Sequence, residues 1–353
     1  MSSGQHIFKC AAQGNPKAIP AEKITLAFGT KINGRVLVSK IQHEDAQVRF
    51  NALKAYCDQI KMPQFAVSFL SAGAVPALYA LVKDESNDIR ALLPFAVSQT
   101  TKSPGGVSEL VKCGMDNLKP LLYDKIENVR QSMYREMETI VKNTLCLNAL
   151  VANGYVGELV GRASSETPQF QSRALKILYM CLLCPDRAAL QLAIDAGAVD
   201  IVLLHLKNEN SESVEFSAKI IGLLCSQQGP LQKVINSSDG IPTLLSLLNG
   251  TNVATIAGSA AAMMVILSDD KAKFKFVDAD GIGTILKLIQ HTDRAVLLHV
   301  LKMISVLAPH PKAKTELNAP VVISRLEIME SDSNDKLIAK CARIAKELIL
   351  RMP

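Results

Sequence analysis

The stretch VDADGIGTILKLIQ, residues 277–290, decides the fold, because it opens with a phrase that recurs along the chain. The phrase consists of a few apolar residues, a small residue, a glycine and a new apolar run. It also reads FLSAG, LVKCG, LVANG, AIDAG and NSSDG, which end at Gly73, Gly114, Gly154, Gly197 and Gly240. With Gly281, successive glycines are 41, 40, 43, 43 and 41 residues apart. A fixed period of this length indicates a repeat architecture.

Each repeat predicts helices. Leucine or a similar residue falls about five and eight positions after the glycine, as at Leu245 and Leu248, which is one face of a short helix. A polar turn follows, and then a longer helix. Pro94 lies inside one of these longer helices, where proline is expected to kink or break it. Two further repeats, near Gly34 and Pro320, extend the array by 39 residues at each end.

Composition excludes several classes of protein. The 353 residues are 48% hydrophobic and only 5% aromatic, without Trp, which disfavours an all-β fold. The net charge of +6 does not require a nucleic acid partner. The opening residues lack the apolar core of a signal peptide, and the most apolar stretch, 254–267, is shorter than the roughly 20 residues of a membrane span. We therefore expect an intracellular protein with reduced thiols, no membrane and no small-molecule substrate.

No catalytic, cofactor or metal site is expected. The glycines at 29 and 34 have phosphate-loop spacing, but Arg35 and Val36 follow where such a loop needs Lys and Ser/Thr. Cys181 and Cys184 form a CxxC pair without a second pair or a nearby His, so they are expected to be small buried residues. The six histidines are dispersed, and His43 and His291 fall in corresponding turns.

A short helix, a glycine turn, a second helix and a longer third helix, about 40 residues in all, resemble the armadillo repeat. HEAT repeats have two helices and tetratricopeptide repeats are 34 residues long. The resemblance implies an all-α, right-handed superhelical solenoid of about eight repeats over residues 24–353, with residues 1–23 as an N-terminal tail. The repeats begin near residues 34, 73, 114, 154, 197, 240, 281 and 320. Each third helix would line a concave groove.

The third helices carry the candidate interaction surface. We number each from an apolar anchor: Val48, Ile89, Val129, Phe170, Val214, Val253, Val296 and Leu337. Six positions on, the first column reads Lys54, Phe95, Arg135, Lys176, Ile220, Ser259, Lys302 and Arg343. Ten positions on, the second column reads Asp58, Gln99, Thr139, Met180, Leu224, Met263, Val306 and Glu347. Neither column holds the Trp or Asn typical of armadillo proteins that carry nuclear-import cargo.

Five of the eight residues in the first column are cationic, and the centre of the second column is apolar. One hypothesis is a groove for an acidic amphipathic helix or an acidic tail. The cations would be Lys54, Arg135, Lys176, Lys302 and Arg343, with Leu224 and Met263 as apolar anchors. The alternative is that the cations are merely solvated and the apolar residues belong to the core.

The N-terminal third carries a more specific resemblance, over residues 24–90. It contains ITLAFG (24–29), RVLVSK (35–40), Val48-Arg49, ALKA (52–55), Cys57-Asp58, PQF (63–65), ALVKD (80–84) and Ile89-Arg90. This series resembles the radial spoke head protein 14 family, armadillo-repeat components of ciliary radial spokes. Membership would imply a non-enzymatic structural role in the axoneme of a motile cilium or flagellum, with other radial spoke proteins as partners.

Two further functions remain open beside the axonemal scaffold. One is a cytosolic armadillo cofactor that promotes nucleotide exchange on a chaperone. The other is a protein-interaction adaptor, such as an adhesion or vacuolar-type scaffold. Such scaffolds usually carry acylation sites, but this sequence has serine where N-myristoylation needs glycine at position 2, and its end is not a prenylation box.

Overall fold

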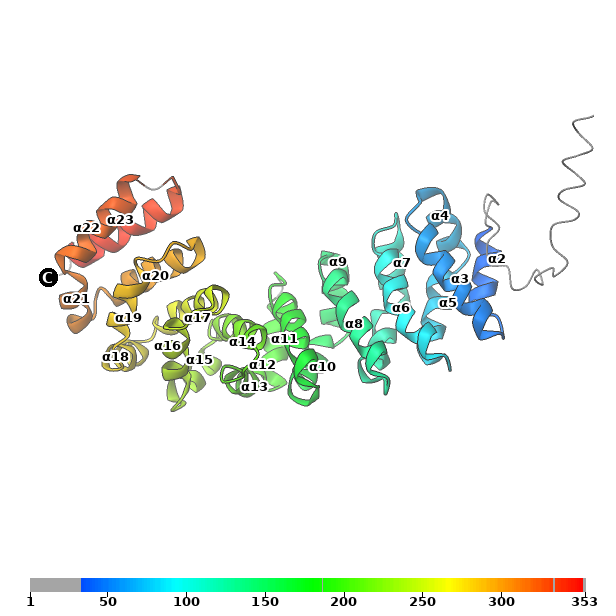
Figure 1. Ribbon diagram of the computed structural model, residues 1–353, viewed down its shortest axis with the longest axis horizontal. Coiled ribbons are helices and arrows are strands. Elements are labelled where there is room, and N and C mark those ends of the chain that lie inside the picture. Colours follow the sequence, from blue (N-terminus) through cyan, green and yellow to red (C-terminus); the bar gives the residue numbers. More distant parts are fainter. Residues whose placement is uncertain (1–32, 186, 333, 352–353) are drawn as a thin grey trace, which may run out of the picture. The chain divides into compact units, whose positions relative to one another are not determined.

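The computed structural model describes residues 33–185, 187–332 and 334–351, and within these ranges it consists of helices, turns and bends (Figure 1). The expected tail, residues 1–23, and the ITLAFG stretch lie outside the described residues. The chain divides into two compact units, one ending at Asn153 and the other beginning at Gly154. Each unit is a stack of helical repeats, and the continuity of one solenoid across both stays a prediction.

The N-terminal unit contains the first part of the repeat array. Its helices are α2 (Gly34–Ile41), α3 (Ala46–Gln59), α4 (Pro63–Ser71), α5 (Ala74–Ala80), η2 (Leu81–Lys83), α6 (Asn87–Thr100), α7 (Gly106–Cys113), η3 (Met115–Tyr123), α8 (Glu127–Ile140) and α9 (Thr144–Ala152). The long helices α3, α6 and α8 pack in that order.

The C-terminal unit continues the same pattern. Its helices are α10 (Tyr155–Ser165), α11 (Pro168–Leu182), α12 (Ala188–Asp195), α13 (Ala198–His205), α14 (Ser211–Leu224), α15 (Gln228–Asn236), α16 (Gly240–Leu248), α17 (Val253–Ile266), α18 (Asp270–Asp278), α19 (Gly281–Leu288), α20 (Arg294–Leu307), α21 (Pro311–Leu317), α22 (Pro320–Asp332) and α23 (Lys336–Arg351). Here α11, α14, α17, α20 and α23 are the long third helices, each packed on the next.

A helix begins at, or one residue after, each of the eight predicted repeat starts. The role of the glycine differs along the array. Gly73 and Gly197 have φ of 84° and 80°, which favours glycine because a Cβ is strained there. Gly281 is instead the first residue of α19, where an added Cβ would lie 2.3 Å from the Phe276 ring, and Asp280 adopts the positive φ. Conformational freedom therefore explains Gly73 and Gly197, and close packing explains Gly281.

Close packing also joins α14 and α17. An added Cβ on Gly222 would lie 3.2 Å from Cα of Ala262, and one on Gly258 would lie 3.2 Å from the backbone oxygen of Glu215. Each helix thus presents a glycine to the backbone of the other. Helix α17, which covers most of the apolar stretch 254–267, is mainly buried, as expected of a core helix.

Two expectations about single helices have clear outcomes. The expected break at Pro94 was wrong, since α6 continues through it from Asn87 to Thr100. Among the described residues, no single helix has both the length and the apolar composition to cross a bilayer. Two sharply bent helix pairs among these residues, 63–83 and 188–205, reach the length and apolar composition of a membrane span only when the two helices of the pair are taken together.

Candidate protein-interaction surfaces

The turn before each third helix fixes where that helix begins. His43 Nδ1 accepts the backbone N–H of Asp45 at 3.0 Å, and His291 Nδ1 accepts that of Asp293 at 2.9 Å. Asp45 and Asp293 then act as N-caps, accepting backbone N–H groups of the first helical turn of α3 and α20. The prediction that His43 and His291 are corresponding turn residues is confirmed. The cap, rather than the first apolar residue, sets the register of the helix.

Counting from the caps corrects the predicted register in the C-terminal unit. Val253 and Leu337, which were used as apolar anchors for the numbering, are 43% and 44% exposed. Val48 and Val296 lie three residues after their caps. The same count from Asn252 in α17 and from Asp335, which accepts the backbone N–H groups of Leu337 and Ile338, gives the buried Thr255 and Ile338.

The same correction changes the first column. Lys54 and Lys302 each lie nine residues after the cap of their helix. In α14, where the cap is Asn210, that position is Lys219 and not the fully buried Ile220. In α23 the equivalent position becomes Ile344, which is 38% exposed, while the predicted Arg343 is exposed beside it. Lys219 was therefore missed by the sequence reasoning, and the Asn210 cap was the signal that could have found it.

Lys219 lies in an aromatic and acidic setting. Its Nζ is 5.1 Å from the ring centroid of Phe216 and 5.7 Å from that of Tyr179, and the two rings are 5.8 Å apart. It also forms an ion pair with Glu215. One helix earlier, Lys176 Nζ lies 3.7 Å from a carboxylate oxygen of Glu212. These contacts place Lys176 and Lys219 on neighbouring helices α11 and α14.

The other predicted cations lie on the same face of their helices. In the N-terminal unit, Lys54 is exposed with Nζ 4.3 Å from the Phe50 ring centroid, and Arg135 pairs with Glu136 at 2.9 Å. Lys302 on α20 is exposed. We call these residues, with Lys176 and Lys219, the third-helix face. Lys54 and Arg135 belong to one unit, and the others belong to the second.

The two predicted apolar anchors are not on this face. Leu224 is 1% exposed and Met263 is fully buried. Both side chains belong to the core, so they cannot contact a partner on the surface of the folded unit. The alternative interpretation, core residues between repeats, holds for both.

The thiols have the properties of core residues. Cys181 and Cys184 are buried, and burial raises the pKa of Cys181 to about 12. Burial also raises the pKa of Cys57 and Cys225 to about 12 each. A thiol with such a pKa is a poor nucleophile and a poor metal ligand at neutral pH. No group of three His, Cys, Asp or Glu side chains suited to a metal was found within the described ranges.

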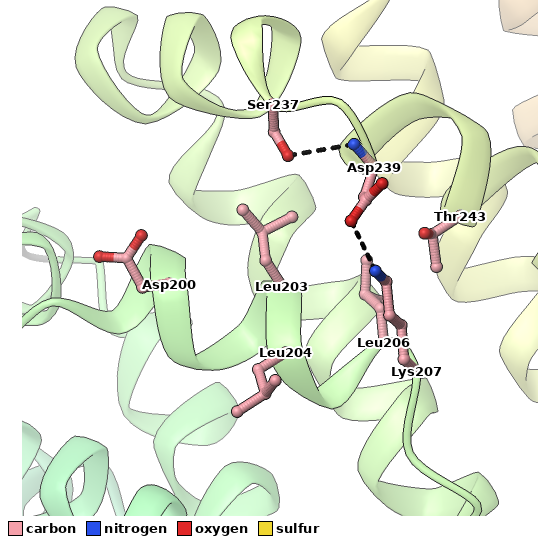
Figure 2. Close-up of a pocket in the computed structure, with 8 residues that line it drawn as sticks. All are labelled: Asp200, Leu203, Leu204, Leu206, Lys207, Ser237, Asp239 and Thr243. Atoms are coloured by element: carbon pink, nitrogen blue, oxygen red, sulfur yellow. Dashed lines mark hydrogen bonds and ion pairs between the residues drawn. The ribbon is translucent and has the colours of Figure 1, made fainter.

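A shallow hollow of about 210 Å³ lies between α13 and the start of α16 in the C-terminal unit (Figure 2). Leu203 lines the hollow, the Asp239 backbone N–H donates to Ser237 Oγ, and Lys207 Nζ lies 2.6 Å from the Asp239 carboxylate. At the other end, Asp200 pairs with Lys233 at 2.6 Å. Both carboxylates are already paired with cations, so the hollow offers little unsatisfied charge to a ligand.

Solved structures with a similar fold are known. An engineered protein superposes with a TM-score of 0.76 at 22% identity, over 90% of this chain and 79% of its own. A designed armadillo repeat protein in complex with the peptide (KR)4 superposes with a TM-score of 0.57 at 19% identity, over 66% of this chain and 98% of its own. The chain has an armadillo-repeat fold. This all-α repeat fold agrees with the prediction from the glycine phrase.

Sequence comparison gives a narrower likeness. Over 132 residues the chain is 31% identical to "Radial spoke protein 14" of Chlamydomonas reinhardtii, which supports the resemblance drawn from the sequence. The match covers 37% of this chain and 34% of that protein, so it spans about a third of the relative's length. No family model matches the chain. The armadillo-repeat fold and this partial match together suggest a scaffold or interaction protein.

Proposed function

We propose that the chain is a non-enzymatic scaffold of the motile cilium or flagellum axoneme, where it binds neighbouring proteins as a radial spoke component. The partial identity with Radial spoke protein 14 of Chlamydomonas reinhardtii carries this proposal. The armadillo-repeat fold supports it, since stacked repeats expose rows of equivalent side chains on which other proteins can bind.

The charge of the third-helix face indicates the partner's chemistry. The designed armadillo neighbour is in complex with (KR)4, an alternating Lys/Arg peptide. The third-helix face presents Lys54 and Arg135 in the N-terminal unit and Lys302 in the C-terminal unit, and in each unit these cations would repel such a peptide. An acidic segment of a neighbouring protein, helical or extended, is the complementary partner.

Localisation of a tagged copy in a ciliated or flagellated cell tests the axonemal role. The tagged chain should remain with the axoneme after detergent removes the membrane, and it should be lost from axonemes that lack radial spokes. Release into the detergent-soluble fraction, or retention in spokeless axonemes, would contradict the proposal. In the first case, acceleration of nucleotide release from a purified chaperone would support the cofactor function instead.

The third-helix face is tested by charge reversal. The double variant Lys54→Glu/Arg135→Glu should lose axonemal retention, because two cations of one unit become carboxylates. The matched control is Lys83→Glu/Lys125→Glu, which makes the same charge change at exposed positions of that unit outside the third helices. Equal retention of both double variants would remove the third-helix face from the binding surface.

A further inference from the structure

In the armadillo repeat the first helix is the one that precedes the glycine turn. Three successive first helices of the N-terminal unit form a separate surface. Figure 1 shows α4, α7 and α9 in succession, and α7 packs against both of the others. Each carries an exposed apolar side chain: Val67 is 64%, Val111 39% and Leu145 60% exposed. The third-helix face lies on other helices of the unit, so this surface is separate from it.

The apolar residues line two hollows that lie on either side of α7. The hollow between α4 and α7, of about 510 Å³, is lined by Val67, Leu70 and Pro104 among others. The hollow between α7 and α9, of about 570 Å³, is lined by Val111 and Leu145 among others. Lys112 borders both hollows.

Lysines also stand in the turns that lead into these three helices. Lys61, Lys102 and Lys142 each directly follow the last capping residue of a third helix, at the turn into α4, α7 or α9. All three are exposed, and their side chains form no ion pair or hydrogen bond with the residues that the structure describes. Lys112 has a 75% exposed side chain, and its contact with Glu109 is 3.4 Å long. Glu109 is the one carboxylate among the residues that line the two hollows.

The fold does not require lysine at these turns. In the C-terminal unit the residues at the equivalent position are Cys184, Ser226, Ser268 and Pro309. The row of lysines is therefore specific to the unit that also has the apolar hollows between its first helices. A feature that packing does not need, placed beside exposed apolar side chains, indicates a contact outside the unit.

We propose that this first-helix face, made of Val67, Val111, Leu145, Lys61, Lys102, Lys112 and Lys142, docks an amphipathic α-helix of another protein whose apolar side is bordered by carboxylates. A helix suits the face because it satisfies its own backbone hydrogen bonds, whereas α4, α7 and α9 offer no strand edge to an extended peptide. Packed helices lie 8–10 Å apart, so three of them span about 20 Å. A helix of about 13 residues covers that length at 1.5 Å per residue.

The form of the face favours a helix over a lipid bilayer. Lysines beside apolar side chains are also typical of membrane-surface helices. Here, however, the apolar side chains line hollows between helices, and a hollow accepts the ridge of an inserted helix. Charge complementarity requires several acidic residues on the docked helix, opposite the four lysines of the face.

A displayed library of 14-residue helices, randomised along one side, tests the proposal. The full chain is the target, and the folded variant Lys61→Glu/Lys102→Glu/Lys142→Glu is the counter-target, with its circular dichroism melt as the folding control. We expect enriched helices to have an apolar side bordered by Asp and Glu. Enrichment of helices that bind target and counter-target equally, or of helices bordered by Lys and Arg, would overturn the proposal.

An enriched helix, made as a fluorescent peptide, then locates the contact. Leu145→Ser should weaken its binding about tenfold, since a buried Leu contributes about 1.5 kcal/mol or more. Lys54→Glu on the third-helix face should leave its binding unchanged. The opposite pattern would assign the contact to the third-helix face. If the chain floats with phosphatidylserine vesicles and Leu145→Ser abolishes flotation, the face binds lipid. If the chain dimerises and Leu145→Ser abolishes dimerisation, the face binds a second copy. Either result would overturn the helix proposal.

Discussion

Arg49 and Asp84 form a bidentate ion pair between neighbouring repeats: Nε donates to Oδ2 at 2.7 Å and Nη2 donates to Oδ1 at 2.9 Å. The same pair recurs one repeat later between Arg90 and Asp124, at 2.6 and 3.2 Å. In both cases Nη1 also donates to a backbone oxygen six residues earlier, in the turn before the helix. Each arginine therefore links its own turn to the turn of the next repeat.

Arg90→Ala should lower the free energy of unfolding by about 1.5–3 kcal/mol, the usual range for hydrogen bonds to charged groups. The Arg90 and Asp124 side chains are only 15% and 9% exposed, so water replaces the lost contact poorly. Arg90→Lys should recover part of the loss, because it keeps the charge without the planar fork. Urea unfolding measures both. The exposed control Lys112→Ala should change stability by less than about 1 kcal/mol, and equal effects at both sites would contradict the role of the pair.

The N-terminal unit should lose stability in acid. Burial opposes ionisation of Asp124, but hydrogen bonds from Arg90 and from the Ile126 backbone, with the charges of Arg90 and Arg130, lower its pKa overall. A lowered folded-state pKa means that the unfolded chain takes up its proton first as the pH falls. The contribution is complete above the unfolded value of about 3.9 and disappears as the pH falls through the lower folded value. Urea midpoints of wild type and Asp124→Asn should therefore differ most above pH 5 and approach each other as the pH falls below about 4.

Gly222→Leu should destabilise the C-terminal unit by about 1–3 kcal/mol, the usual cost of overpacking. The new Cβ would lie 3.2 Å from Cα of Ala262, so α14 and α17 would have to separate. Thermal unfolding followed by circular dichroism measures the loss. The matched control is Gly157→Ala on α10, where an added Cβ meets no atom within 4 Å. It should raise stability by about 0.5–1 kcal/mol, and a Gly222→Leu protein as stable as wild type would show that the two helices are not in close contact.

Thiol labelling should separate the cysteines by exposure. Among the cysteines of the described ranges, Cys341 is partly exposed and should react first with a maleimide at pH 8. Cys113 is also partly exposed, but desolvation and Glu109 raise its pKa, so it should react more slowly. Cys181 and Cys225 should react only when the chain unfolds, because burial raises the pKa of each to about 12. Peptide mass spectrometry over time measures the order, and fast labelling of Cys181 in the folded chain would contradict the buried position.

The sequence alone predicted the repeat and the third helices, because the glycine phrase marks a backbone turn that every repeat must make. It was less accurate for single side chains. Val253 and Leu337 are apolar residues in the first turn of their helices, so numbering from them misplaced the surface of α17 and α23. Burial of Leu224 and Met263 likewise depends on how neighbouring helices pack, which periodicity does not specify.

Other features involve residues from two repeats and could not be read from one helix. Arg49 and Asp84 are 35 residues apart, and their pairing becomes visible only when successive repeats are superposed. The hollows on either side of α7 likewise need three helices in place. The evenly spaced Lys61, Lys102 and Lys142 were a signal in the sequence, but no single repeat shows what they border.

The Arg–Asp pairs have a mechanical consequence. Under tension, neighbouring repeats of the N-terminal unit are held by short bidentate ion pairs, which rupture after a small extension. Each arginine side chain is 15% exposed, so salt screens those links in part as ionic strength rises. Between α14 and α17 the resistance comes from backbone contact at Gly222 and Gly258, which salt does not screen. Stretching experiments at low and high salt should therefore alter the rupture force of the N-terminal repeats and leave that of the α14–α17 contact the same.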